Sequence, residues 1–142
     1  MTGKPAPVTE RDSVPFWEAL ARHELALQRC DSCKAWRWPP REICKQCGSF
    51  EWSWVPASGD GTIASWIVNH HTFSDAFQSP YVVLAVRLDE ADDIVMYGEW
   101  SGAQDGSDLS VGMPVRVEFD DQPAPAEGEE AFSLLRWRAV GS

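Results

Sequence analysis

The sequence has few of the features that mark membrane proteins, exported proteins or independent enzymes. No stretch approaches the roughly 18 consecutive apolar residues that a membrane-spanning helix requires. Residues 1–10 are polar and carry prolines, without the apolar segment of an export signal. We therefore expect a soluble, cytoplasmic chain that does not contact a membrane.

Motifs for catalysis are also missing. No serine lies in a G-x-S-x-G turn, and no glycine-rich loop of the phosphate-binding or dinucleotide-binding kind occurs. The three histidines are too few and too scattered to build a catalytic metal centre. Since no nucleophile is paired with a base, we assign no catalytic residue and expect no activity from the chain alone.

What the sequence does contain is a group of four cysteines, all of those in its 142 residues. They form two C-x-x-C pairs, Cys30 with Cys33 and Cys44 with Cys47, separated by ten residues. Two residues between paired thiols let both sulfurs face one centre, and the spacer lets the chain double back, which predicts a tetrahedral thiolate site. Zinc is the default ion there, and rubredoxin-type iron is the less favoured alternative. Because protein ligands fill all four positions, we expect a structural metal.

Two other uses of the cysteines fit less well. A disulfide framework needs an oxidising compartment and usually an export signal. A redox-active pair needs one C-x-x-C at the start of a helix, rather than two pairs with a short spacer.

The net charge of −10 is unevenly distributed. Residues 89–130 hold thirteen acidic residues and one base, which we interpret mainly as solvated surface and loop. The cysteine region is basic instead, with Arg29, Lys34, Arg37, Arg41 and Lys45. These cations either offset the charge of metal-bound thiolates or meet phosphates or an acidic partner surface, and the sequence leaves both readings open.

The first part of the chain reads as a helix followed by a ribbon of short strands. Ser13 as N-cap, Pro15 in the first turn and helical spacing through His23 predict a helix that ends near Glu24. Strands are expected at 25–29, 36–38 and 50–55, with a tight turn at Gly48. We divide this part into a disordered leader, a helix with its lead-in strand, and a zinc ribbon, at residues 1–12, 13–28 and 29–56.

Residues 57–142 read as a barrel. A joint rich in glycine, serine and proline precedes strands expected at 62–73, 81–88, 94–100, 115–119 and 132–140. In the first of these, Ile63, Ser65, Ile67 and Asn69 are expected on one face. A mobile loop is predicted at 120–130. Five strands, with Gly98 where a strand can bend sharply, predict a mainly β chain with a small closed barrel of the OB type.

Several aromatic and polar residues are candidates for contact with a ligand or a partner. Eight tryptophans are many for this length, and Trp36, Trp38, Trp52 and Trp54 exceed what a small ribbon can bury. His70 and His71 fall at the end of the first barrel strand, a region that commonly contributes to the ligand surface of OB folds. The simpler interpretation is that one of these histidines is half-buried and the other lies on the surface, without a ligand. The candidate contact residues are Arg37, Trp38, Arg41, Trp66, His70, His71, Phe73, Phe77 and Tyr81.

An ordered set of short motifs resembles a known family. Phe16-Trp17 opens the helix, Leu27-Gln28-Arg29-Cys30 enters the ribbon, and Pro39-Pro40-Arg41 lies between the cysteine pairs. Cys44-x-x-Cys47-Gly48, Ser58-Gly59-x-Gly61-Thr62-Ile63, Pro80-Tyr81-Val82-Val83 and Val111-Gly112-Met113-Pro114-Val115 follow in order. Together they cover about residues 14–140 and resemble the acyl-CoA-associated zinc-ribbon/OB-fold family, long catalogued as a domain of unknown function.

This resemblance implies a helix, a rubredoxin-like zinc ribbon and an OB barrel. It also implies a non-catalytic accessory subunit in a hetero-oligomer with a thiolase-fold enzyme that acts on CoA thioesters, by aldol cleavage, condensation or acyl transfer, in lipid or steroid metabolism. Contact with acyl-CoA is a further possibility that it raises. The alternative from another class is a nucleic-acid-binding module, which the strong negative charge of the barrel half disfavours.

Overall fold

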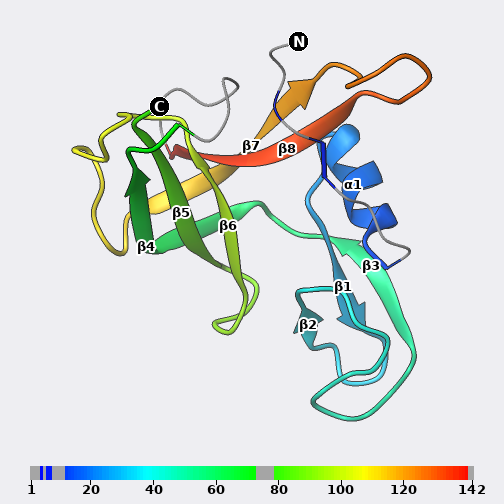
Figure 1. Ribbon diagram of the computed structural model, residues 1–142. Helices are drawn as coiled ribbons and strands as arrows, with labels where there is room; N and C mark the ends of the chain where they lie inside the picture. The colour runs from blue at the N-terminus through cyan, green and yellow to red at the C-terminus, as the bar shows by residue number, and fades with distance from the viewer. Residues whose placement is uncertain (1–3, 5, 8–11, 73–78, 141–142) are drawn as a thin grey trace.

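The computed structural model describes residues 4, 6–7, 12–72 and 79–140. These residues form one helix and two β-sheets, which confirms the mainly β prediction (Figure 1). The first part holds α1 (Val14–Ala21), β1 (Ala26–Cys30), β2 (Trp36–Arg37) and β3 (Trp52–Pro56). The second holds β4 (Asp60–Asn69), β5 (Tyr81–Leu88), β6 (Val95–Trp100), β7 (Pro114–Gln122) and β8 (Phe132–Ala139). No helix of the described chain is long and apolar enough to cross a bilayer.

Helix α1 is short and packs on the rest of the molecule through one face. Proline lies in its first turn, where a missing N–H is tolerated, and Phe16, Ala19 and Leu20 are buried. The predicted continuation through His23 is wrong. His23 has a left-handed backbone (φ 62°), and the N–H of Glu24 donates to Ala19 O at 2.9 Å, which closes the helix. The chain turns here because Leu25 and Ala26 must enter the core at the start of β1.

The ribbon is a three-stranded antiparallel sheet in the order β2-β1-β3. Its central strand β1 is buried almost throughout, and it pairs Gln28 with Arg37 of β2 and with Trp54 of β3. The ribbon and the barrel lie side by side, and α1 lies between the ribbon and the β7–β8 hairpin (Figure 1). The first residues of the predicted strand at 50–55 remain outside β3, and Phe50 is exposed.

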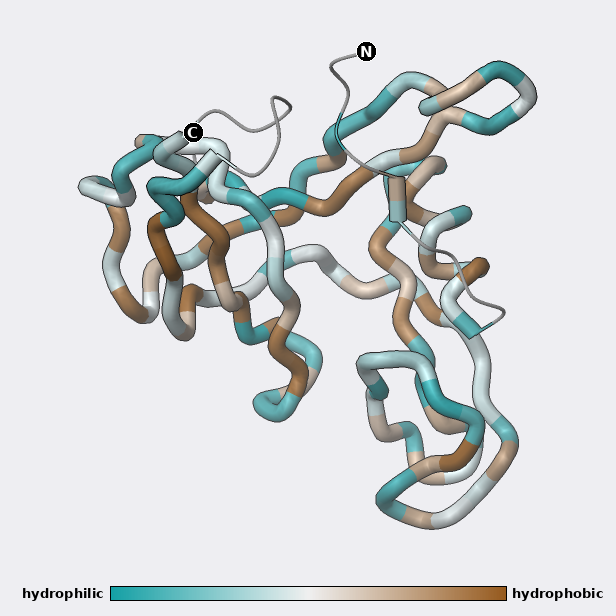
Figure 2. The backbone as a smooth tube through the Cα atoms, in the orientation of Figure 1, coloured by the Kyte–Doolittle hydropathy of each residue, from teal (hydrophilic) through white to brown (hydrophobic). Residues whose placement is uncertain are grey.

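The second sheet closes into a barrel in the order β4-β5-β6-β8-β7. Neighbouring strands are antiparallel except β6 and β8, which are parallel, so the predicted five-stranded OB barrel is confirmed. Figure 2 shows apolar stretches along the barrel strands, and others along α1 and β1. The fully buried side chains inside it include Ile63, Leu84, Val86, Val115 and Trp137.

One strand departs from the simple alternation that we expected. The pairing of β4 with β5 shifts between Ile63 and Ser65, so that Ala64 is an extra residue. Because side chains alternate with a period of two, the extra residue exchanges the two faces of the strand. Ile63 is buried while Ile67 is 64% exposed, and Trp66 and Val68 pack against the core instead. The prediction of one common face for Ile63 and Ile67 is therefore wrong.

The β7–β8 hairpin is longer than the sequence indicated. β7 continues to Gln122, which pairs with Phe132, so three residues of the predicted loop at 120–130 belong to a strand. This hairpin extends out of the barrel and runs along α1 (Figure 1). The helix and the ribbon therefore pack against the extended hairpin of the barrel, and the candidate site lies where they meet.

Candidate functional site

The four cysteines converge on one point. Their sulfur atoms all lie within 4.8 Å of one another, with Cys30 Sγ 3.7 Å from Cys47 Sγ and Cys33 Sγ 3.6 Å from Cys44 Sγ. A tetrahedral ion with metal–sulfur bonds of about 2.3 Å holds its ligands about 3.8 Å apart. The sulfurs therefore fit such an ion, and the four cysteines are positioned to bind a metal. None of them takes part in a disulfide.

Two similar backbone turns place the sulfurs. In the first, the N–H of Lys34 donates to Cys30 O at 3.0 Å, and in the second the N–H of Gly48 donates to Cys44 O at 2.8 Å. Both residues that end these turns are left-handed, with φ of 67° at Lys34 and 78° at Gly48. Glycine adopts this conformation without cost, which confirms the predicted tight turn at Gly48.

The same turns favour the thiolate form at the first cysteine of each pair. The backbone N–H of Cys33 is the main cause that lowers the pKa of the Cys30 thiol to about 6. The N–H of Cys47 lowers the pKa of the Cys44 thiol in the same way. At Cys33 the N–H of Ala35 lowers the pKa, but burial and the neighbouring sulfurs outweigh it and raise the pKa to about 11. Thiolates are the form that binds metal, so the turns favour metal binding at Cys30 and Cys44.

A buried polar pair lies beside this group in the ribbon. Gln28 is 1% exposed and Arg37 is 7% exposed. Gln28 Oε1 accepts hydrogen bonds from Arg37 Nε at 2.7 Å and from the backbone N–H of Arg41 at 2.8 Å. The guanidinium of Arg37 also lies over the ring of Trp52, 5.3 Å from its centroid. Of the candidate contact residues, Arg37 is thus part of the ribbon interior, while Arg41 is exposed.

A cleft lies between the helix, the ribbon and the outer face of the barrel. It has a volume of about 430 Å³ and brings together two candidate contact residues, Trp38 of the ribbon and Tyr81 of β5. Trp38 also packs on Phe16, with ring centroids 4.5 Å apart. We call it the aromatic cleft; its lining residues are Lys4, Phe16, Trp17, Trp38, Tyr81, Val83, Met96, Tyr97, Glu99, Asp120, Leu134, Leu135 and Arg136.

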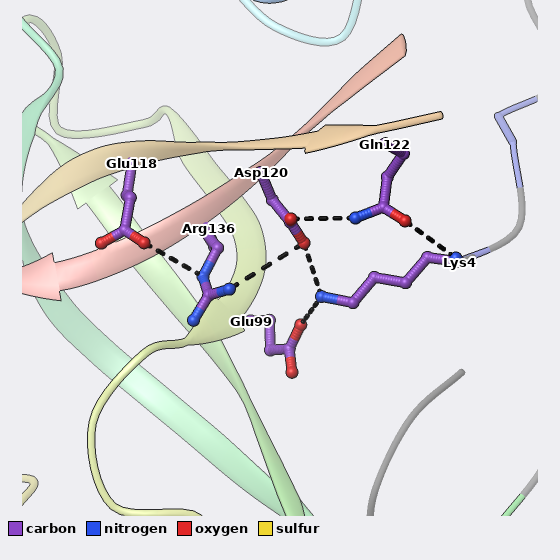
Figure 3. A network of polar contacts seen from close by, with 6 residues as sticks. All are labelled: Lys4, Glu99, Glu118, Asp120, Gln122 and Arg136. Carbon is purple, nitrogen blue, oxygen red and sulfur yellow. Dashed lines mark hydrogen bonds and ion pairs between the residues drawn. The ribbon is translucent and has the colours of Figure 1, made fainter. Parts of the chain in front are cut away.

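The charged residues of the aromatic cleft are paired with one another. Lys4 Nζ lies 2.5 Å from Glu99 Oε1 and 2.6 Å from Asp120 Oδ2, and Arg136 Nη1 lies 3.9 Å from the same Asp120 oxygen (Figure 3). The backbone N–H of Lys4 donates to Gln122 Oε1 at 2.9 Å. Burial lowers the pKa of the Lys4 ammonium, but its hydrogen bonds to Asp120 and Glu99 outweigh this and hold the pKa above 10.5. These contacts attach Lys4 to β6 and β7.

Sequence reasoning missed most of the cleft. Tyr97 and Glu99 face outward from β6, and Leu134 and Arg136 lie along β8 beside the buried Trp137. The alternation of buried and exposed positions along these strands indicates which residues face outward. Nothing in the sequence indicates that α1 and Lys4 pack over the same face.

The other candidate contact residues lie elsewhere. Trp66 packs against the barrel core, and His70 and His71 are exposed beyond the end of β4, where Asn69 hydrogen-bonds the backbone of His71. None of the three lines the aromatic cleft. Phe73 and Phe77 lie outside the described residues.

One grouping has the residue types of a hydrolytic triad but not its geometry. Asp121 accepts hydrogen bonds from Ser133 Oγ at 2.5 Å and contacts His23 Nε2 at 2.8 Å. A nucleophilic serine must instead be bonded to the histidine that removes its proton. Ser133 first and His23 second lower the pKa of the Asp121 carboxyl below 3.8. We therefore assign this group to attachment of the helix end to β7 and β8.

Comparison with known proteins matches this architecture. Residues 17–53 match the family model of the ChsH2 rubredoxin-like zinc ribbon domain, and residues 54–120 match that of the ChsH2 C-terminal OB-fold domain. A solved structure, the Ltp2-ChsH2(DUF35) aldolase, contains a chain with TM-score 0.81 and 34% identity, and the match covers 95% of this chain and 99% of that one. The chain belongs to the ChsH2 family.

Two curated relatives extend the ChsH2 comparison. A probable enoyl-CoA hydratase alpha subunit of Thermomonospora curvata is 44% identical over 116 residues, which are 82% of this chain and 35% of that protein. A 3-oxo-4,17-pregnadiene-20-carboxyl-CoA hydratase alpha subunit of Mycobacterium tuberculosis is 35% identical over 131 residues, which are 92% of this chain and 39% of that protein. This ChsH2-family chain thus spans less than half the length of both relatives.

Proposed function

We propose that this chain is a non-catalytic accessory subunit of a hetero-oligomeric complex that acts on CoA thioesters. The observation that carries the proposal is the match over 99% of a chain in the Ltp2-ChsH2(DUF35) aldolase, at 34% identity. The names of two relatives as CoA hydratase alpha subunits support the substrate class. A partner of the thiolase fold supplies the catalytic groups. The name of the Ltp2-ChsH2(DUF35) aldolase supports carbon–carbon cleavage of the aldol type as the reaction of the complex.

The arrangement of reactive side chains supports a role without catalysis. The four thiols converge on one another, and the described histidines line no part of the aromatic cleft. The charged residues of the cleft are engaged in ion pairs, and Ser133 is bonded to a carboxylate rather than to a histidine. No described group in the cleft therefore combines a nucleophile with a base.

We assign zinc to the cysteine site, in a structural role. Four thiolates leave no open position for water or substrate, which is the pattern of structural rather than catalytic zinc. Cys30, Cys33, Cys44 and Cys47 hold the ion, and it fixes the two turns on either side of the segment that carries Trp36, Trp38 and Arg41. Rubredoxin-type iron is the competing ion, and metal analysis of protein from unsupplemented medium separates the two.

We assign the aromatic cleft to contact with the partner subunit. Tyrosine and tryptophan are enriched in protein interfaces, and Trp17, Trp38, Tyr81 and Tyr97 gather here. Tyr97 is 71% exposed on the barrel surface, although it is a large ring. Because the charges of the cleft neutralise one another, the cleft suits apolar side chains of a protein rather than the phosphates of CoA.

Complex formation tests this function directly. The chain is coexpressed with thiolase-fold enzymes of the same genome, one at a time, and the mass of any copurified complex is measured by light scattering. Tyr97→Glu should abolish or weaken the complex, because it places a charge against an apolar partner surface. Val111→Glu changes a residue that is also 71% exposed but lies outside the cleft, and it should leave the complex intact. Two separate proteins in every wild-type sample would refute the proposal.

A further inference from the structure

The ribbon contains a buried positive charge with unused donors. Arg37 Nη1 and Nη2 and Gln28 Nε2 are buried, and none has a hydrogen-bond partner in the part of the chain that the structure describes. The neighbouring Oε1 of Gln28 is already fully used by Arg37 Nε and the N–H of Arg41. All three unmatched atoms are hydrogen-bond donors, and the arginine side chain stays protonated and positively charged in proteins. The site therefore lacks an acceptor, and buried charge without one is strongly unfavourable.

The charged side chains that line a hollow beside Arg37 are mainly positive. A small hollow of about 30 Å³ lies between the ribbon and the barrel, lined by Trp36, Arg37, Trp38, Arg41, Lys45, Asp93 and Ile94. Lys45 Nζ lies 3.3 Å from Asp93 Oδ2, so one of three cations is paired. The lining thus carries two more positive than negative charges, in a chain whose net charge is −10. Arg41 and Lys45 are exposed at its rim and have long side chains that can move aside for a ligand.

We propose that this hollow binds a phosphate group, with Arg37 as the buried anchor and Arg41 and Lys45 at the rim. A guanidinium presents paired N–H donors that match the oxygens of a phosphate, and the bonds are strengthened by charge. This proposal rests on the proposed function, since a CoA thioester carries its phosphates on the nucleotide part. The hollow would hold that end of the molecule, next to the aromatic cleft, with which it shares Trp38.

The proposal predicts an unusual result for the free protein. Arg37→Met keeps much of the side-chain volume and removes the unmatched charge, while Gln28 Oε1 still accepts from the N–H of Arg41. Replacing a buried unpaired charge with an apolar side chain is neutral or stabilising. The melting temperature of this variant should therefore equal or exceed that of the wild type. A marked fall would show that Arg37 serves the fold, and it would overturn the proposal.

Binding is tested on the full chain by NMR, following the Nε–H resonance of Arg37, which is assigned by its loss in Arg37→Met. Coenzyme A and pyrophosphate should shift this resonance at low salt, whereas pantetheine, which has no phosphate, should not. Isothermal titration calorimetry, which does not depend on the Arg37 resonance, should show that Arg37→Met weakens coenzyme A binding roughly 10- to 100-fold, the usual loss for a hydrogen bond to a charged group.

Arg29→Met is the matched control. Arg29 is a ribbon arginine that already donates to Lys34 O at 2.9 Å and lies over Trp36, so its loss should leave binding unchanged. No shift with either phosphate compound would mean that buried water alone satisfies Arg37, and an equal shift with pantetheine would mean that the site does not recognise phosphate. Either result would overturn the proposal. Complex formation with the thiolase-fold partner is measured separately, so failure of this site and failure of the proposed function give different results.

Discussion

Substitution of Gly98 by alanine should destabilise the barrel through one identified contact. Gly98 lies in β6 opposite Leu84, and the indole of Trp137 packs directly against it. A Cβ at this position would lie 2.8 Å from Trp137 Nε1, 2.9 Å from its Cδ1 and 3.1 Å from Leu135 O. Ordinary contacts begin at 3.4 Å, so the fully buried indole would have to move by about half an ångström.

Overpacking of this kind costs about 1–3 kcal/mol in a well-packed core. For a chain of this length the cost corresponds to a fall in melting temperature of roughly 3–10 °C. Thermal unfolding followed by circular dichroism measures it. Tyr97→Phe is the control, because Tyr97 is the preceding residue and points outward, and it should change stability by less than about 0.5 kcal/mol.

A double substitution makes the test specific. Trp137→Phe leaves room for the new methyl group, so Gly98→Ala should cost less in that background than in the wild type. The packing of Trp137 against Gly98 is not as described if Gly98→Ala has the same melting temperature as the wild type. The same conclusion follows if Gly98→Ala costs the same free energy in both backgrounds.

Three further predictions concern the metal site and the ion pairs. Cys44→Ser should lose the bound metal and unfold the ribbon, since such an ion contributes about 10 kcal/mol or more to folding. Mass spectrometry under native conditions detects the loss of the ion, and the control variant Ser32→Ala should keep one ion per chain. Lys4→Met should lower the unfolding free energy by about 1–3 kcal/mol in denaturant titrations, because it leaves Glu99 without its cation and Asp120 with the more distant Arg136 alone. Asp121→Asn should alter acid unfolding: the folded pKa of Asp121 lies below 3.8, so its contribution is present above pH 3.8 and is lost as the pH falls through the folded value. The wild type should thus lose more stability than the variant on acidification below about pH 4, and equal slopes would contradict the Asp121 contacts.

Local patterns explain why the cysteine site and the barrel could be predicted. The C-x-x-C spacing fixes two sulfurs of each pair within a single turn, so little depends on the rest of the fold. The barrel strands are marked by apolar alternation and by turns rich in glycine.

Features that depend on one extra residue or on distant packing could not be predicted. The additional residue at Ala64 exchanges the faces of β4 without any mark in the sequence. The helix ends before His23 because Leu25 is needed in the core, which propensity does not reveal. The aromatic cleft arises where α1, Lys4 and an extended hairpin meet, and Arg37 is buried because Gln28 accepts its Nε–H.

The central claim is that this chain assists a reaction carried out by another polypeptide. The most direct measurement is steady-state cleavage of an acyl-CoA thioester by the purified thiolase-fold partner alone, by this chain alone and by the two mixed. The account predicts no turnover by this chain, and a rate for the mixture that exceeds the sum of the separate rates and saturates at a fixed ratio of the two proteins. Turnover by this chain alone, or a partner whose rate is unchanged by its addition, would contradict the account.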